Sequence, residues 1–236
     1  HAEQHLGGPS LEDDGTPFYI DVTEVTLAAY LDCVAQSGGQ CEEPNRVVLE
    51  ARAAKVLLGV DGGDPEALEQ SWQQQCNLRR DEKEDPVNCV KHRSASGYCR
   101  FVGKRLPTEA EWRVAALGDG RTFPWGDGAP GCADACFAKN GACYPRGGAL
   151  TTCSTLEVGK DETPDGVLGM YGNVAEWVAG GGGGQKVMMG GSFFDDADDL
   201  TGATRRSMPD TTAFVSIGFR CAMDAPAAAD EDAKDP

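Results

Sequence analysis

The chain has few basic residues. Its 236 residues include 21 Lys and Arg against 38 Asp and Glu, which gives a formal net charge of −17 at pH 7. Proteins that bind nucleic acid neutralise phosphates with clustered Lys and Arg, so this balance argues against a nucleic-acid partner. An acidic chain is better suited to metal cations or to basic partners.

The chain also lacks a long apolar run, a signal peptide and a starting methionine. No apolar stretch approaches the roughly 18 residues of a membrane-spanning helix, so we expect no transmembrane segment in this chain. The missing leader predicts a processed or truncated product, from which a signal peptide or a lipid-anchored N-terminus has been removed. His1 could chelate copper through its amine and imidazole, but truncation at an arbitrary histidine is the simpler interpretation.

Long periodic segments are scarce, whereas glycine and proline are plentiful. The 31 glycines and 13 prolines favour an irregular α+β chain with a large loop fraction. Nothing in the middle of the sequence has the composition of an interdomain linker, so we expect one domain over 1–224. Residues 225–236, rich in Ala, Asp and Pro, predict a disordered acidic tail.

Ten cysteines are many for a reduced cytosolic protein of this length. A framework of disulfides is typical of a secreted, periplasmic or cell-surface protein. We therefore expect a disulfide-stapled, extracytoplasmic chain.

Capping and breaking residues predict several short helices. One should run from Thr26 to about Ala35, and an insertion at about 46–80 should contain two more, over Val47–Leu58 and Pro65–Gln75. Ser94 or Ser96 should cap a helix that ends near Val102. Thr108-Glu109-Ala110-Glu111 has the form of a capping box for the next helix, with Trp112 facing the core. We expect these last two helices to pack together.

Five short blocks occur in a fixed order along the chain. They are Gly103-Lys-Arg-Leu-Pro-Thr-Glu-Ala-Glu-Trp112, Phe123-Pro-Trp-Gly126, Gly172-Asn-Val-Ala-Glu-Trp177, Gly190-Gly-Ser192 and Gly218-Phe-Arg-Cys221. In this order they resemble the formylglycine-generating enzyme (sulfatase-modifying factor) family, and the resemblance covers about Pro17 to Asp224. It implies a fold similar to C-type lectins.

The same resemblance implies copper chemistry that this sequence does not support. Active members carry two copper-binding cysteines soon after the Gly-Gly-Ser block, because thiolates are the soft ligands that copper(I) prefers. Here no cysteine lies between Cys153 and Cys221, so we expect no bound copper and no formylglycine synthesis. Sulfoxide synthases of similar fold use a site of three histidines. This chain has only three histidines in all, His1, His5 and His92, so the sequence gives little support to such a site.

The resemblance also implies a calcium site. In the family, carbonyl groups at the positions of Gly172 and Val174 and the carboxylate of Glu176 bind the ion, and hard oxygen ligands of this kind suit Ca²⁺. The fourth family ligand, usually Asn or Asp, is Gly169 here. The alternative is that Glu176 accepts hydrogen bonds from backbone amides in a tight turn.

An aspartate run follows the Gly-Gly-Ser block. It could form a second cation site, a docking patch for a basic partner, or a solvated acidic loop, with Arg205 and Arg206 nearby to offset its charge. Its acidic members are Asp195, Asp196, Asp198 and Asp199.

The resemblance implies a disulfide between Cys99 and Cys221. The other cysteines fall into two groups of four, each of which allows three pairings by two disulfides. A four-thiolate zinc site is an alternative for the second group. The first group is Cys33, Cys41, Cys76 and Cys89, and the second is Cys132, Cys136, Cys143 and Cys153.

Fold does not dictate function, so three functions stay open. The leading hypothesis is a non-catalytic extracytoplasmic binding or structural module, a pseudoenzyme that binds a protein partner in an envelope or surface assembly. The second is a metal- or thiol-dependent enzyme with a rebuilt site, an oxidoreductase of the sulfatase-modifying type. The third is a carbohydrate-binding, lectin-like domain, although the Glu-Pro-Asn and Gln-Pro-Asp signatures of such lectins are missing.

Overall fold

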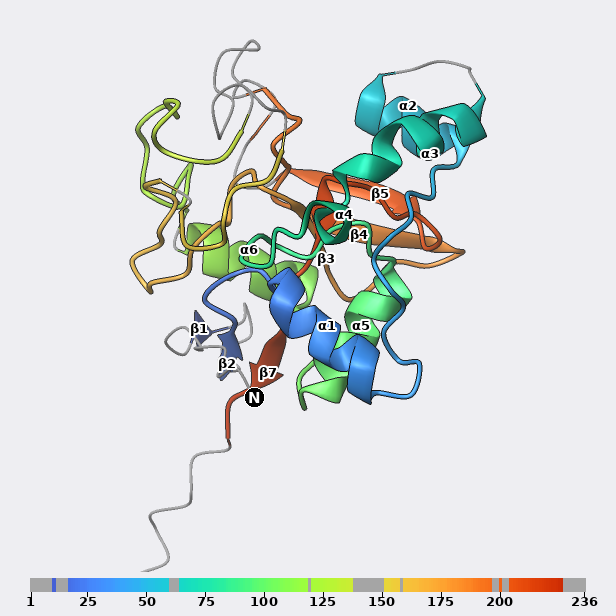
Figure 1. Ribbon diagram of the computed structural model, residues 1–236. Coiled ribbons are helices and arrows are strands. Elements are labelled where there is room, and N and C mark those ends of the chain that lie inside the picture. The colour runs from blue at the N-terminus through green and yellow to red at the C-terminus, as the bar shows by residue number, and fades with distance from the viewer. Residues whose placement is uncertain are drawn as a thin grey trace, which may run out of the picture.

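The computed structural model of the protein describes residues 10–11, 17–59, 64–118, 120–137, 151–157, 159–196, 200 and 204–226. Short helices surround two small β-sheets, and irregular segments connect them (Figure 1). This arrangement confirms the α+β, loop-rich fold class that the sequence predicts.

The larger sheet has four strands in the order β5-β4-β3-β6. They are β3 (Ala175–Trp177), β4 (Gln185–Met189), β5 (Arg205–Pro209) and β6 (Ile217–Gly218). β3 pairs antiparallel with β4 and parallel with β6. The Gly-Asn-Val-Ala-Glu-Trp block therefore ends in the interior of the sheet, with a neighbour on both sides.

The smaller sheet joins the two ends of the described chain. Its strands, in the order β1-β2-β7, are β1 (Ser10–Leu11), β2 (Pro17–Ile20) and β7 (Ala222–Asp224). β2 and β7 are antiparallel, so that Phe18 lies opposite Asp224. Most of the tail predicted over 225–236 lies outside the described residues.

Two helices begin where their capping residues predict. α1 (Leu27–Gln36) follows Thr26, whose hydroxyl oxygen accepts a hydrogen bond from the amide of Ala29. α6 (Glu109–Leu117) has a complete capping box, in which the side chains of Thr108 and Glu111 each accept a hydrogen bond from the other residue's amide. These bonds satisfy amide groups that a helix leaves unpaired at its N-terminus.

Trp112 of α6 is fully buried, as expected. It packs directly against the Gly-Gly-Ser block, because a Cβ atom at Gly190 would lie 2.8 Å from Cζ2 of Trp112. Gly190 also has φ of +90°, a conformation that disfavours other residues. Both the positive φ and the close approach of Trp112 therefore require glycine at position 190.

α5 (His92–Phe101) corrects two expectations. It begins two residues before Ser94, with Lys91 at the N-cap position and no side-chain cap, so neither predicted serine starts the helix. Its main helical neighbour among the described residues is α1, not α6. Buried ring contacts explain this, because Tyr98 of α5 stacks on Tyr30 of α1 at 5.7 Å.

The insertion expected at about 46–80 is helical, as predicted. Its elements are α2 (Ala51–Leu58), α3 (Pro65–Trp72), the 3₁₀ turn η1 (Gln73–Gln75) and α4 (Asn77–Arg80). α2 begins later than expected because Val48 forms an antiparallel β-bridge with Ala213. In Figure 1, α2 and α3 project beyond β5 at one corner of the molecule.

Four disulfides connect the described segments. One of them joins Cys99 to Cys221, as the resemblance implies. The others join Cys33 to Cys41, Cys76 to Cys89, and Cys136 to Cys153. Cys132 is also disulfide-bonded, and Cys143 lies outside the described residues. The second group therefore does not form the alternative four-thiolate zinc site. Within the described ranges, no helix is long and apolar enough to span a membrane.

Candidate functional site

The block that ends in β3 places a carboxylate at the centre of the fold. Gly172 and Asn173 turn the chain with positive φ, and β3 then sets Glu176 opposite Met189 of β4 and Gly218 of β6. Two residues after Gly218 the chain reaches Arg220. The sheet register thus brings Glu176 and Arg220 together.

Glu176 is held by Arg220 and Trp112, and not by the backbone amides of a turn. The guanidinium Nε of Arg220 lies 2.9 and 2.8 Å from the two carboxylate oxygens, and its Nη2 lies 2.7 Å from Oε1. The indole Nε1 of Trp112 donates to Oε2 at 2.8 Å. Both Glu176 and Arg220 are buried, so this is a desolvated ion pair whose geometry is fixed by several hydrogen bonds.

Arg220 also connects two distant segments of backbone, at residues 21–22 and 168–169. Its two terminal nitrogens donate to carbonyl oxygens at 2.8 to 3.2 Å. These carbonyls belong to Asp21, Val22, Leu168 and Gly169. A guanidinium has five N–H donors in a rigid plane, so one side chain can fix all these groups.

Two further carboxyl groups lie in the same buried region. Oε1 of Glu24 accepts a hydrogen bond from Asn173 at 2.9 Å, and Oδ2 of Asp161 accepts one from the amide of Tyr171 at 2.7 Å. The remaining oxygen of each carboxyl has no hydrogen-bond partner within the described part of the chain. With Glu176, three acids share one guanidinium.

This imbalance changes the titration of both groups. Burial raises the pKa of Glu24 from its ordinary 4.5 to about 8, and the charge of Glu176 adds to the effect while Arg220 opposes it. Burial likewise raises the pKa of Asp161 well above its usual value, with a further contribution from Glu24. Glu24 therefore holds a proton at neutral pH, because an unpaired buried carboxylate is more costly than the neutral acid.

Glu24 also explains the glycine at position 169. A Cβ atom there would lie 2.7 Å from Oε2 of Glu24, and Gly169 has φ of +68°. The carboxyl group of Glu24 thus occupies the space that a side chain at 169 would need. Sequence reasoning missed Glu24, Asp161 and the partner role of Arg220, because no local pattern links residues so far apart in the chain.

The calcium prediction for Gly172, Val174 and Glu176 stays a prediction. As arranged, both oxygens of Glu176 accept hydrogen bonds from Arg220, so this donor set does not fit a cation unless Arg220 releases the carboxylate. Among the residues with described placement, no group of three or more His, Cys, Asp or Glu is arranged to hold a metal ion.

The aspartate run is partly tied into the fold. Asp195 forms an ion pair with Arg206 and accepts hydrogen bonds from the amide and hydroxyl of Ser192 at 2.8 and 3.0 Å. Arg206 therefore offsets the charge of Asp195, as the sequence indicated, whereas Arg205 pairs with Glu109 instead. Asp196 is half-buried, and Asp198 and Asp199 lie outside the described residues.

The loop after the Gly-Gly-Ser block is also covered by aromatic rings. Phe193 is fully buried. The ring of Phe194 meets Trp72 of α3 edge-on at 5.1 Å and lies tilted against Phe214 at 5.7 Å. α3 thus packs on the loop that follows the Gly-Gly-Ser block.

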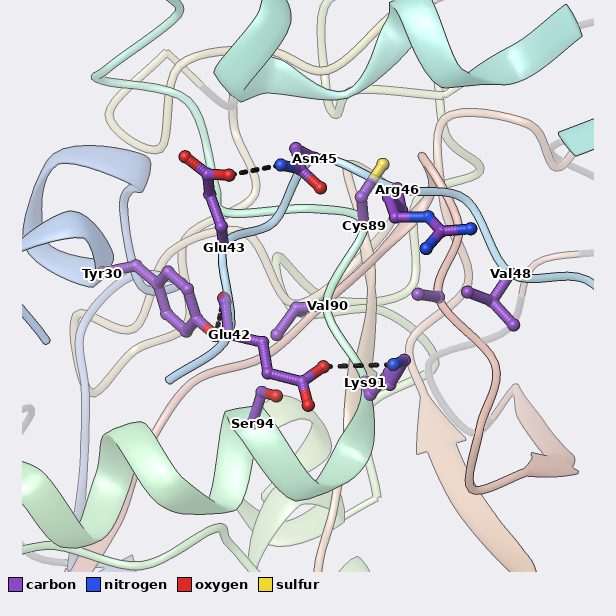
Figure 2. Close-up of a pocket in the computed structure, with 11 residues that line it drawn as sticks. Tyr30, Glu42, Glu43, Asn45, Arg46, Val48, Cys89, Val90, Lys91 and Ser94 are labelled. Carbon is purple, nitrogen blue, oxygen red and sulfur yellow. Dashed lines mark hydrogen bonds and ion pairs between the residues drawn. The ribbon is translucent and has the colours of Figure 1, made fainter. Parts of the chain in front are cut away.

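A small cavity of about 150 Å³ opens beside α1 and α5. Figure 2 shows Glu42 turned toward Lys91 across this cavity, with Tyr30 donating to the backbone carbonyl of Glu42 at 2.9 Å. Burial pushes the pKa of Glu42 up, but hydrogen bonds and positive charge from Lys91 and Arg93 outweigh it and lower the pKa. Glu42 is thus an ionised bridge between two cations.

Comparison with known proteins identifies the scaffold. A family model described as a sulfatase-modifying factor enzyme 1-like domain matches residues 4–225. A formylglycine-generating enzyme of Streptomyces coelicolor is 36% identical over 126 residues, which are 47% of this chain and 40% of that protein. An inactive Cα-formylglycine-generating enzyme 2 of Mus musculus is 28% identical over 246 aligned residues, 92% of this chain and 79% of that protein.

Two solved structures share the fold. PvdO from Pseudomonas aeruginosa superposes with a TM-score of 0.60 at 19% identity, covering 94% of this chain and 91% of that one. CarF superposes with a TM-score of 0.58 at 21% identity, covering 94% and 95%.

Proposed function

Because the chain belongs to the family of sulfatase-modifying factor enzyme 1-like domains, we propose that it is a non-catalytic binding or structural module on that scaffold. We propose further that it works outside the cytoplasm and binds a protein partner as a subunit of an envelope or surface assembly. The disulfides between distant segments support the location, since such bonds persist in oxidising compartments.

The arrangement of the loop after Ser192 carries the proposal. Where active family members place two thiolates, this chain has an Asp195–Arg206 ion pair and the ring of Phe194 against Trp72. A carboxylate paired with a guanidinium is a poor ligand for copper(I), which prefers soft sulfur. The insertion that supplies Trp72 also covers the loop.

No cysteine elsewhere in the described ranges can replace the missing pair of copper-binding thiolates. Within the described ranges every cysteine is disulfide-bonded, so no thiolate is available as a nucleophile or a copper ligand. The mouse relative that aligns with most of this chain carries the word inactive in its name, and this likeness also supports a module without the oxidase reaction.

The test is a count of free thiols on native protein. Unfolded without a reductant and treated with an alkylating reagent, the protein should show no modified cysteine by mass spectrometry, because all ten are expected in disulfides. The same sample reduced first is the control and should show ten modified cysteines. A pair of modified cysteines before reduction, together with binding of one copper(I) per chain, would support the rebuilt-site enzyme instead.

A further inference from the structure

A cavity of about 650 Å³ lies beside α5, along residues from His92 to Arg100. It is adjacent to the cavity in Figure 2, because Val48 and Lys91 line both. Its volume is in the range of sites that hold small organic ligands, about 300–1,000 Å³. None of the residues of the Gly-Gly-Ser loop or of the buried acid cluster lines it.

The charge of its lining is opposite to that of the chain. Four cationic side chains contribute to the walls, and Asp210 is the single carboxylate among the lining residues. The cations are Lys91, Arg93, Arg100 and Lys186. In a chain of net charge −17, such a concentration of positive charge in one hollow gives a local potential that attracts anions.

Carboxylates outside the lining neutralise only part of this charge. Glu42 pairs with both Lys91 and Arg93, and Glu50 accepts a hydrogen bond from the lining hydroxyl of Thr211 at 2.6 Å. With Asp210, these three acids still leave a surplus of one positive charge over the four cations. The cavity is therefore cationic even when its neighbours are included.

The two lining cations that form no ion pair within the described part of the chain are Arg100 and Lys186. Arg100 donates to the hydroxyl of Ser96 at 2.7 Å and forms no ion pair within the described part of the chain. Lys186, on β4, likewise has no carboxylate within ion-pair distance among those residues. Both side chains keep donors for a ligand, and a guanidinium matches carboxylate and phosphate groups in geometry.

His92 lies in the wall but adds no charge at neutral pH. Its Nε2 lies 3.1 Å from the carbonyl oxygen of Val178, and its ring meets Trp177 edge-on at 5.7 Å. Burial lowers its pKa below the ordinary value of 6.5, against the opposing effect of the bond to Val178. His92 is thus a neutral part of the cavity wall.

We propose that this cavity binds a small organic molecule through a phosphate or carboxylate group, held by Arg100 and Lys186. The site goes beyond the proposed function, because it shares no residue with the loop that decides catalysis. A chain that proved catalytic would leave this inference standing, and failure of the inference would leave the proposed function standing.

Calorimetric titration at low salt tests the site with three related probes. Glucose 6-phosphate supplies a phosphate, glucuronate supplies a carboxylate, and glucose supplies neither. We expect saturable binding of at least one of the two anions, no binding of glucose, and weaker binding as salt is added, because salt screens exposed charges. Comparison of the affinities for the two anions shows whether the site prefers a phosphate or a carboxylate group.

Paired variants separate the site from the charge of the whole protein. The double variant Arg100→Gln, Lys186→Gln should lower the affinity for the anion by about tenfold or more, since two charge-assisted contacts are lost. Arg113→Gln with Lys160→Gln removes the same charge from positions outside the cavity and should leave binding unchanged. Binding of neither anion, equal binding of glucose, or equal weakening in the two double variants would overturn the proposal.

Discussion

Replacing both Cys99 and Cys221 by alanine should lower the free energy of unfolding by about 4–5 kcal/mol. The bond joins residues 122 apart in sequence, and a long closed loop restricts the unfolded chain more than a short one does. Both cysteines are fully buried, and the bond attaches α5 to the segment between β6 and β7. Urea unfolding without a reductant measures the loss.

The matched control is the short disulfide between Cys33 and Cys41. These residues are 8 apart, so their double alanine variant should lose only about 2.5 kcal/mol by the same loop-entropy relation. An equal loss in the two variants, or a larger loss for the short loop, would show that the long disulfide does not stabilise the fold by constraining the unfolded chain.

The stability of the protein should fall as the pH rises from about 5 to about 8, because of the protonated acid inside the cluster. Folding raises the pKa of Glu24 from 4.5 to about 8, so between these values the folded state binds more protons than the unfolded state. The contribution of Glu24 to the free energy of unfolding is therefore fully present below the pKa of 4.5 and is lost as the pH rises through the folded-state pKa of about 8. Asp161 acts in the same direction.

Glu24→Gln tests this directly. A neutral amide needs no proton, so the part of the decline that is due to Glu24, on the order of 3 kcal/mol, should disappear. The slope should become shallower, with the contribution of Asp161 remaining, and the variant should be the more stable protein at pH 8. Unfolding free energies measured in a chelator at several pH values give the comparison. Glu157→Gln, at an exposed position, should retain the wild-type slope. A rise of stability with pH, or an unchanged slope in Glu24→Gln, would contradict the account.

Local chemistry in the sequence predicts the parts of the fold that local contacts determine. Thr26 and the Thr108–Glu111 capping box start their helices because their hydrogen bonds span only three residues. The predicted start of α5 lies too far along the chain, because the true N-cap position has no capping side chain that the sequence could reveal. Tertiary contacts, such as the stacking of Tyr98 on Tyr30, position this helix instead.

The candidate site could not be predicted in the same way. The cluster brings together Glu24, Asp161 and Arg220, which are separated by most of the chain, and no pattern within any one segment indicates that they meet. The family resemblance located Glu176, but its pairing with Arg220 follows from the register of β3 against β6. Likewise, each group of four cysteines allowed three connectivities until the fold set their distances.

The family reaction itself tests the central claim most directly. The protein should be incubated with copper and oxygen and with a peptide that carries the sulfatase Cys-x-Pro-x-Arg motif, beside the Streptomyces coelicolor relative as the positive control. With Asp195 paired to Arg206 where thiolates would be needed, the account predicts that this chain leaves the peptide cysteine unchanged while the relative converts it. Formation of formylglycine by this chain, seen as the mass loss of that conversion, would contradict the account.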